Sequence, residues 1–146
     1  MKSLIQRVSS ASVTAGAEVT GQIGEGLLVF LGYEKGDSLE IARKSIDKII
    51  RMRIFEDEAG KLNLDLTQHG GSMLLVSQFT LAADLSRGHR PGFDNAMRPD
   101  EARKLYEETV AYAKEQFSGR VETGRFGTDM KVALVNEGPC TFMLCL

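Results

Sequence analysis

The feature that most constrains the fold is a Gly-Pro pair inside an apolar run near the carboxyl end of the chain. Residues Met130 to Val135 have strand character, and the run resumes at Cys140 after Gly138-Pro139. A proline within a central strand removes one hydrogen bond of the ladder, so its presence there requires a reason. Two interpretations are open: a turn between two short strands, or a rigid piece of backbone presented to a ligand.

Length and charge limit the class of protein. A chain of 146 residues with a hydrophobic fraction of 42% predicts one domain, residues 1–146, with a core of its own. The formal net charge of -2 argues against a broad nucleic-acid-binding face, and no DNA partner is expected. A local basic patch that holds one end of an RNA is still compatible with this charge.

Cysteine spacing and hydropathy predict a cytoplasmic protein without metal. Cys140 and Cys145 are five positions apart in one apparent strand, so their side chains point to opposite faces and do not pair. No Cys/His spacing resembles a zinc site, and we expect no metal. The first residues contain no apolar leader, and the aliphatic run Leu27–Leu31 is too short to span a bilayer. No membrane partner is expected.

The amino-terminal half predicts strands followed by one helix. Strand-like segments cover residues 4–8, 11–14, 18–23 and 27–31, and the last of them is apolar on both faces, as in a central strand. Asp37 and Glu40 have the spacing of a capping box with Asp37 as the N-cap. Apolar residues then recur at helical spacing to Ile50.

The second half predicts a strand, a long connection, a second helix and two further strands. A strand is expected from Met73 to Phe79, followed by a long surface connection from Ala83 to Arg98. Pro99 opens a second amphipathic helix that stops near Gly119, and strands follow at 121–126 and 130–135. The sequence therefore predicts an α+β fold with a curved, mostly antiparallel, barrel-like sheet and two main helices.

Standard catalytic motifs are absent, but one polar segment stands out. The chain has no nucleophile elbow, phosphate-binding loop or dinucleotide fingerprint, so no cofactor is expected. Ser77-Gln78-Phe79-Thr80-Leu81 places two hydroxyls and an amide at the end of an apolar strand. The segment is either an ordinary strand end, with Ser77 satisfying a nearby carbonyl, or a polar binding site.

This segment, together with Asn136-Glu137-Gly138-Pro139-Cys140-Thr141, resembles the two signature motifs of the D-aminoacyl-tRNA deacylases, also called D-tyrosyl-tRNA deacylases. The resemblance covers essentially the whole chain. It includes, in order, Ile5-Gln6-Arg7-Val8 with Ala11-Ser12-Val13, Gly26-Leu27-Leu28-Val29, Arg53-Ile54-Phe55, Arg87-Gly88 with Arg90-Pro91, and Gly124-Arg125-Phe126. Cys140 departs from the valine usual in the family, and Gly92 from a common polar residue.

The resemblance implies a homodimer that hydrolyses the ester between a D-amino acid and the terminal ribose of tRNA. It assigns the catalytic site to Ser77, Gln78, Phe79 and Thr80. It assigns the rejection of L-amino acids to Gly138 and Pro139, with Asn136 beside them, inserted into the site of the opposite subunit. Either Thr80 is the nucleophile, or water attacks with help from backbone N–H groups and the ribose 2′-hydroxyl; both mechanisms stay open.

Basic residues are the candidate contacts to tRNA phosphates, although a charged helix face is often only solvated. The candidates are Arg7, Lys44, Lys48, Arg51, Arg87, Arg90, Arg98 and Arg103. Three other functions compete with the deacylase: a non-catalytic RNA-binding module, a hydrolase of another acyl ester and a purely structural dimer.

Overall fold

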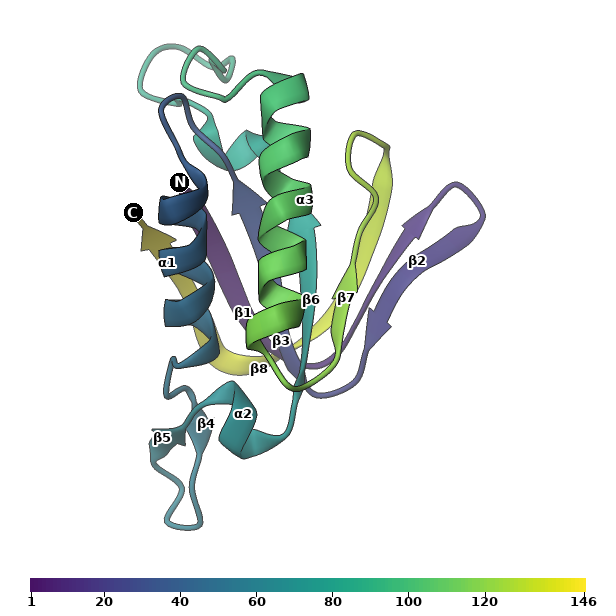
Figure 1. Ribbon diagram of the computed structural model, residues 1–146, viewed down its shortest axis with the longest axis vertical. Coiled ribbons are helices and arrows are strands. Elements are labelled where there is room, and N and C mark those ends of the chain that lie inside the picture. Colours follow the sequence, from purple (N-terminus) through teal and green to yellow (C-terminus); the bar gives the residue numbers. More distant parts are fainter.

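The computed structural model describes residues 1–146 and contains a strongly curved six-stranded sheet (Figure 1). The order β2-β1-β3-β6-β7 forms one path, and β8 pairs with the other edge of β1. β1 is antiparallel to β2, β3 and β8, whereas β3, β6 and β7 run parallel to one another. The strands of this sheet are β1 Lys2–Ala15, β2 Glu18–Ile23, β3 Gly26–Gly32, β6 Ser72–Ser77, β7 Val121–Thr123 and β8 Met130–Cys145.

Two long helices lie side by side over one face of the sheet (Figure 1). They are α1, Leu39–Ile50, and α3, Pro99–Gln116. A small unit at the lower end consists of β4, Phe55–Glu56, β5, Leu62–Leu64, and α2, Leu66–His69. None of the helices combines the length and apolar character that crossing a membrane requires.

Alternation along the central strands builds two separate cores. Leu27 and Val29 of β3 pack in the larger cluster beneath the helices, whereas Leu28 joins a smaller cluster on the opposite face. β6 divides in the same way, with Leu75 in the first cluster and Leu74 in the second. Both strands are therefore buried on two faces, which explains their continuous apolar sequences.

The sheet curves far enough to bring β2 against β7. A β-carbon added to Gly21 in β2 would lie 2.4 Å from the carbonyl oxygen of Thr123, so only glycine permits this approach. The second core is enclosed by this curvature. The predicted fold class is confirmed, with a nearly closed sheet as expected; the parallel pairing of β3, β6 and β7 was not foreseen.

The pairing of β1 with β8 is interrupted where the Gly-Pro pair lies. Gln6 pairs with Thr141 and Val8 pairs with Asn136, so Arg7 alone faces the four residues 137–140. We call residues 137–140 the Gly-Pro bulge. β8 thus runs unbroken from Met130 to Cys145, and the interpretation of Gly138-Pro139 as a turn between two separate strands is wrong.

The bulge changes the face that β8 turns inward. Val132 and Leu134 pack against the smaller core, whereas Phe142 and Leu144 pack against the larger core on the opposite face. All four positions are even, and a regular strand would place them on one face. The three extra residues of β8 in the bulge, an odd number, supply the exchange.

Several predicted local details are wrong. Ser38, not Asp37, caps α1, because Asp37 instead accepts hydrogen bonds from the backbone N–H of Glu34 at 2.6 Å and the Met1 ammonium at 2.8 Å. β1 is one strand rather than two. The strand expected to reach Phe79 ends at Ser77, and the chain turns there into a short 3₁₀ helix. The strand expected at 121–126 ends at Thr123.

Candidate functional site

A pocket of about 800 Å³ lies at the carboxyl ends of the three parallel strands. Leu31 at the end of β3, Ser77 at the end of β6 and Phe126 after β7 all line it. Ligand sites in sheets with parallel strands favour this edge, because the chain leaves every strand there in a loop. The first turn of α3 closes one side of the pocket through Arg98, Pro99 and Ala102.

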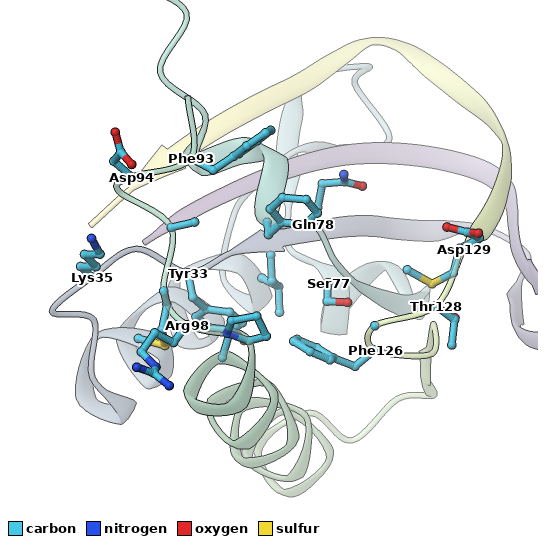
Figure 2. Close-up of a pocket in the computed structure, with 18 of the residues that line it drawn as sticks. Tyr33, Lys35, Ser77, Gln78, Phe93, Asp94, Arg98, Phe126, Thr128 and Asp129 are labelled. Atoms are coloured by element: carbon cyan, nitrogen blue, oxygen red, sulfur yellow. The ribbon is translucent and has the colours of Figure 1, made fainter. Parts of the chain in front are cut away.

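Three of the four predicted catalytic residues, Ser77, Gln78 and Phe79, line this pocket, whereas Thr80 does not. The N–H of Gln78 donates to the carbonyl of Leu31 at 2.8 Å, and the chain then turns into the 3₁₀ helix η1, Phe79–Ala82. A β-carbon on Gly32 would lie 2.7 Å from Cβ of Leu81, so this glycine lets η1 pack over the end of β3. Ser77 and Gln78 extend from this wall in Figure 2.

The hydroxyl of Thr80 has an amide rather than a base as its neighbour. The side-chain amide of Gln78 donates to Thr80 Oγ1 at 2.5 Å. Backbone N–H groups at the start of a helix have no partner within it, and those of Phe79 and Thr80 make no hydrogen bond in the chain. The site therefore offers two free N–H donors beside a hydroxyl without an adjacent general base.

The remaining pocket wall is mixed apolar and charged. Phe79 and Phe93 face each other at 5.1 Å between ring centroids, and both are exposed. Asp94 and Asp129 lie on opposite sides of the pocket in Figure 2. Burial raises the pKa of the Tyr33 hydroxyl above its usual value, so this pocket residue stays protonated and donates to Thr109 at 3.0 Å.

The long connection 83–98 is fastened beside the pocket rather than loose on the surface. The N–H of Lys35 donates to the carbonyl of Asn95 at 2.9 Å, and the N–H of Met97 donates to the carbonyl of Tyr33 at 3.1 Å. Asp84 and Gly92 form a further bridge that isolates residues 85–91 as an exposed tip. The tip carries Arg87 and Arg90.

The Gly-Pro bulge lies at the lower bend of β8 in Figure 1, away from the pocket. The Gly138-Pro139 peptide bond is cis, a point that the sequence left open. Glu137, Gly138 and Pro139 are exposed, whereas Cys140 is buried. None of the residues 136–141 lines the pocket of its own chain, so a single chain does not bring the two predicted motifs together.

Arg7 occupies the base of the bulge. Its Nε donates to the carbonyl of Glu137 at 3.2 Å, and its other nitrogens reach the carbonyl of Ile54 at 2.8 Å and the carboxylate of Glu56 at 3.6 Å. Only 11% of the side chain is exposed. These contacts give Arg7 a place in the support of the bulge, while its predicted contact with tRNA stays a prediction.

Five of the other predicted RNA contacts fall into two groups. Of the remaining two, Arg98 lines the pocket and the guanidinium of Arg103 lies over the ring of Phe126. Lys44, Lys48 and Arg51 border a shallow groove on α1 of about 460 Å³. Asp47 lies in the same groove, and Glu40 accepts a hydrogen bond from Lys44 at 2.7 Å, so local carboxylates offset part of its positive charge. Arg87 and Arg90 lie on the exposed tip, a few residues before Phe93 and Asp94, which line the pocket.

Sequence reasoning missed most of the pocket wall. Tyr33, Phe93, Asp94, Phe126 and Asp129 come from separate segments whose convergence depends on the parallel pairing. The available signal was that each follows a strand or precedes a helix at the same edge of the sheet. No group of three or more His, Cys, Asp or Glu side chains is placed to hold a metal ion.

The fold and the site together define an α+β protein with a nearly closed sheet and a ligand pocket at the ends of its parallel strands. Residues 4–145 match the family model for D-Tyr-tRNA(Tyr) deacylase. A D-aminoacyl-tRNA deacylase of Erwinia tasmaniensis is 54% identical over 144 residues, 99% of each chain. The corresponding protein of Xanthomonas campestris pv. campestris is 52% identical over the same share. The chain therefore belongs to the D-Tyr-tRNA(Tyr) deacylase family, and the predicted family is confirmed.

Two solved structures have the same fold as this chain. The "c-Myc DNA Unwinding Element Binding Protein" superimposes with a TM-score of 0.95 and is 34% identical, covering 100% of this chain and 99% of its own. A "probable eukaryotic D-amino acid tRNA deacylase" has a TM-score of 0.83 at 16% identity and covers 98% and 97%. The second similarity concerns the fold alone.

Proposed function

We propose that this protein hydrolyses D-aminoacyl-tRNA to free tRNA and a D-amino acid. The observation that carries the proposal is the pocket of about 800 Å³ at Ser77, Gln78 and Phe79 in a chain of this family. Its volume lies within the usual range for sites that bury a small ligand, about 300–1,000 Å³. The terminal adenosine and its aminoacyl ester would occupy it, one site per chain within a single domain.

Selection between mirror-image esters requires a wall rather than a fitted side-chain pocket. Discrimination of about 10⁴-fold needs about 5.5 kcal/mol. An apolar pocket supplies only about 1–3 kcal/mol per methylene-sized difference and would restrict the enzyme to few amino acids. Rigid backbone against the α-carbon would instead reject the β-carbon of every L-residue. Gly138 and Pro139 suit this task because glycine allows close approach and proline fixes φ.

The wall would come from the partner in a homodimer. Gly138 and Pro139 are exposed and lie outside the pocket of their own chain, so they are available to a second copy. A sizing experiment would test whether the dimer forms. A mixed dimer of one chain altered at the pocket and one altered at the bulge would retain a single intact composite site, whereas sites formed within each chain would all be damaged.

For the chemical step we favour attack by water. The water oxygen bonds to the ester carbonyl carbon, the bond to the ribose oxygen breaks, and that oxygen takes a proton. The unpaired N–H groups of Phe79 and Thr80 would stabilise the oxyanion, and the ribose 2′-hydroxyl would assist. Thr80 as the nucleophile is less favoured because its hydroxyl meets the Gln78 amide, a donor, instead of a base.

Replacing Thr80 by alanine separates these two mechanisms. Attack by water predicts turnover within about tenfold of the unchanged enzyme, since the backbone donors are retained. A nucleophilic role predicts loss of nearly all turnover and an acyl-enzyme that the unchanged protein accumulates. Loss of activity on tRNA that ends in 2′-deoxyadenosine would support assistance by the substrate.

Binding of tRNA would rest on phosphate contacts that do not read sequence. Arg87 and Arg90 are the better-placed candidates because their tip belongs to the connection whose residues Phe93 and Asp94 line the pocket. The groove of Lys44, Lys48 and Arg51 is the second candidate. A cytoplasmic location is part of the proposal. A DNA partner, which the name of one structural neighbour mentions for that protein, is not part of the proposal.

The direct experiment compares D-tyrosyl-, L-tyrosyl- and glycyl-tRNA as substrates. We expect rapid ester loss from the D-form, little from the L-form, and some from the glycyl form, because glycine has no β-carbon for the wall to reject. Failure to hydrolyse the D-ester would refute the function. Robust D-turnover with a completely inert glycyl ester would refute the wall alone.

A further inference from the structure

The two ends of the Gly-Pro bulge, at Asn136 and Thr141, are joined by side-chain hydrogen bonds. We call these two residues together with Gln6 the neck of the bulge. The bulge places four residues opposite Arg7 alone, so regular pairing between β1 and β8 stops on either side of it. Asn136 Nδ2 crosses the neck and donates to the carbonyl of Cys140 at 3.1 Å. This bond joins the residue before the bulge to its last residue.

Thr141, the residue that follows the bulge, bonds to both of the other side chains of the neck. Its Oγ1 accepts a hydrogen bond from Asn136 Nδ2 at 3.3 Å and another from Gln6 Nε2 at 3.2 Å. An amide nitrogen has two hydrogens and a hydroxyl oxygen two lone pairs, so one network satisfies all of these bonds. Gln6 belongs to β1, and the network therefore ties both ends of the bulge to the neighbouring strand.

We infer that Gln6 and Thr141 are positioning residues that set the selectivity of the enzyme for D-esters. This inference rests on the proposed function, because it assumes that Gly138 and Pro139 form the wall. A wall rejects L-esters only while it stays in place, and its selectivity is limited by the fraction of molecules in which it has moved. The three side chains of the neck, Gln6, Asn136 and Thr141, keep that fraction small.

The location of these hydrogen bonds allows an effect on the selectivity of the enzyme to be separated from an effect on the stability of the fold. The two hydrogen bonds to Thr141 lie at the surface, where they add little to the stability of the whole fold. Each hydrogen bond nevertheless shifts a local equilibrium by roughly 2- to 12-fold. Removing both is expected to raise the displaced fraction on the order of tenfold while the chain stays folded.

Thr141→Val removes the shared acceptor and preserves the shape of the side chain. We expect kcat/KM for L-tyrosyl-tRNA to rise on the order of tenfold, kcat/KM for D-tyrosyl-tRNA to stay within about threefold, and the D/L ratio to fall accordingly. Gln6→Met removes one donor and should lower the ratio by a smaller factor. Thr141→Ser keeps the hydroxyl and should restore the ratio.

Thr14→Val is the matched control, since Thr14 is a half-buried threonine of the same sheet whose hydroxyl has no hydrogen-bond partner. A D/L ratio that Thr141→Val leaves within twofold of the unchanged enzyme overturns the inference, as does a serine variant no more selective than the valine one. Equal losses on both esters overturn it too. If the unchanged enzyme shows no D-selectivity at all, the proposed function fails instead, which distinguishes the two failures.

Discussion

The pocket and the Gly-Pro bulge are held in position by different interactions. The pocket wall at Ser77 continues a strand whose preceding residues are buried on both faces, so its position follows from the core. The bulge lies outside the ladder, and its three exposed residues depend on Arg7 and Asn136 for their position. A binding site can thus be as firm as its sheet, whereas a selectivity wall can depend on a few polar side chains. Changes in the two regions should have separable effects. Changes in the pocket should alter the affinity for substrate, and changes in the bulge should alter the selectivity for D-esters.

The largest effect is expected from Gly138→Ala. The new β-carbon would lie 3.2 Å from Oδ1 of Asn136 and would project from the proposed wall. A displacement of about 1 Å in a reacting geometry costs on the order of 10²-fold, so kcat/KM for D-tyrosyl-tRNA should fall at least about 100-fold. Gly24→Ala is the control, because its β-carbon would meet nothing within 4 Å. Activity of the Gly138 variant within threefold of the original would remove the wall from the mechanism.

A somewhat smaller effect is expected from Arg7→Ala. The bulge would lose its hydrogen bond at the Glu137 carbonyl, and we expect the D/L ratio of kcat/KM to fall 10- to 100-fold, roughly 1.4–2.8 kcal/mol, mainly because L-esters are hydrolysed faster. Arg7→Lys should not restore the ratio, since an ammonium lacks the planar fork of guanidinium.

A phosphate contact at Arg7 predicts a different pattern. Binding would then weaken equally for both esters, and the dependence of log K on log salt would lose about one unit of slope. Arg120→Ala, which removes an exposed arginine paired with Glu122, controls for the change in net charge.

The pocket should respond through affinity. Phe93→Ala deletes one member of the aromatic pair at the pocket, and stacking of a base on an aromatic ring contributes about 1–3 kcal/mol. We expect KM to rise roughly tenfold with an unchanged D/L ratio. Leu85→Ala, an exposed apolar residue of the same connection, should leave KM unchanged. A fall in the D/L ratio of the Phe93 variant would mean that the two regions do not act separately.

The smallest effect is expected at the basic tip. Replacing Arg87 and Arg90 together by alanine should raise KM about threefold at physiological salt and reduce the salt slope by one to two units. The triple change of Lys44, Lys48 and Arg51 should matter less, because Asp47 and Glu40 already offset their charge. The opposite order would place the tRNA along α1.

The pattern of apolar residues predicted those parts of the fold in which the type of each residue follows from its own burial. The buried stripe of α3 and the doubly buried β3 are confirmed. Asp37 was mistaken for a cap because a local pattern contains no information about Met1, whose ammonium binds that carboxylate at 2.8 Å. The path of β8 through Gly138-Pro139 was missed for a related reason: an unpaired bulge within a strand and a turn between strands share the same residues.

The sequence predicted only those residues of the candidate site that belong to a contiguous motif. Ser77, Gln78 and Phe79 do line the pocket, and the family that the two motifs resemble is confirmed. The rest of the wall, such as Phe93 and Asp129, was not predicted, because it depends on which strand ends are neighbours. A continuous apolar run shows that a strand is buried on two faces but does not show which strand lies beside it.

The exchange of faces along β8 has a consequence for insertions and deletions. Because Leu134 and Phe142 serve cores on opposite sides of the sheet, the bulge between them must contain an odd surplus of residues over the one residue, Arg7, that it faces. Loss of a single residue from the bulge would turn Phe142 and Leu144 toward solvent, whereas loss of two would keep them in the core. Changes of length here are tolerated only in pairs, so the fold itself protects the length of the segment that carries Gly138 and Pro139.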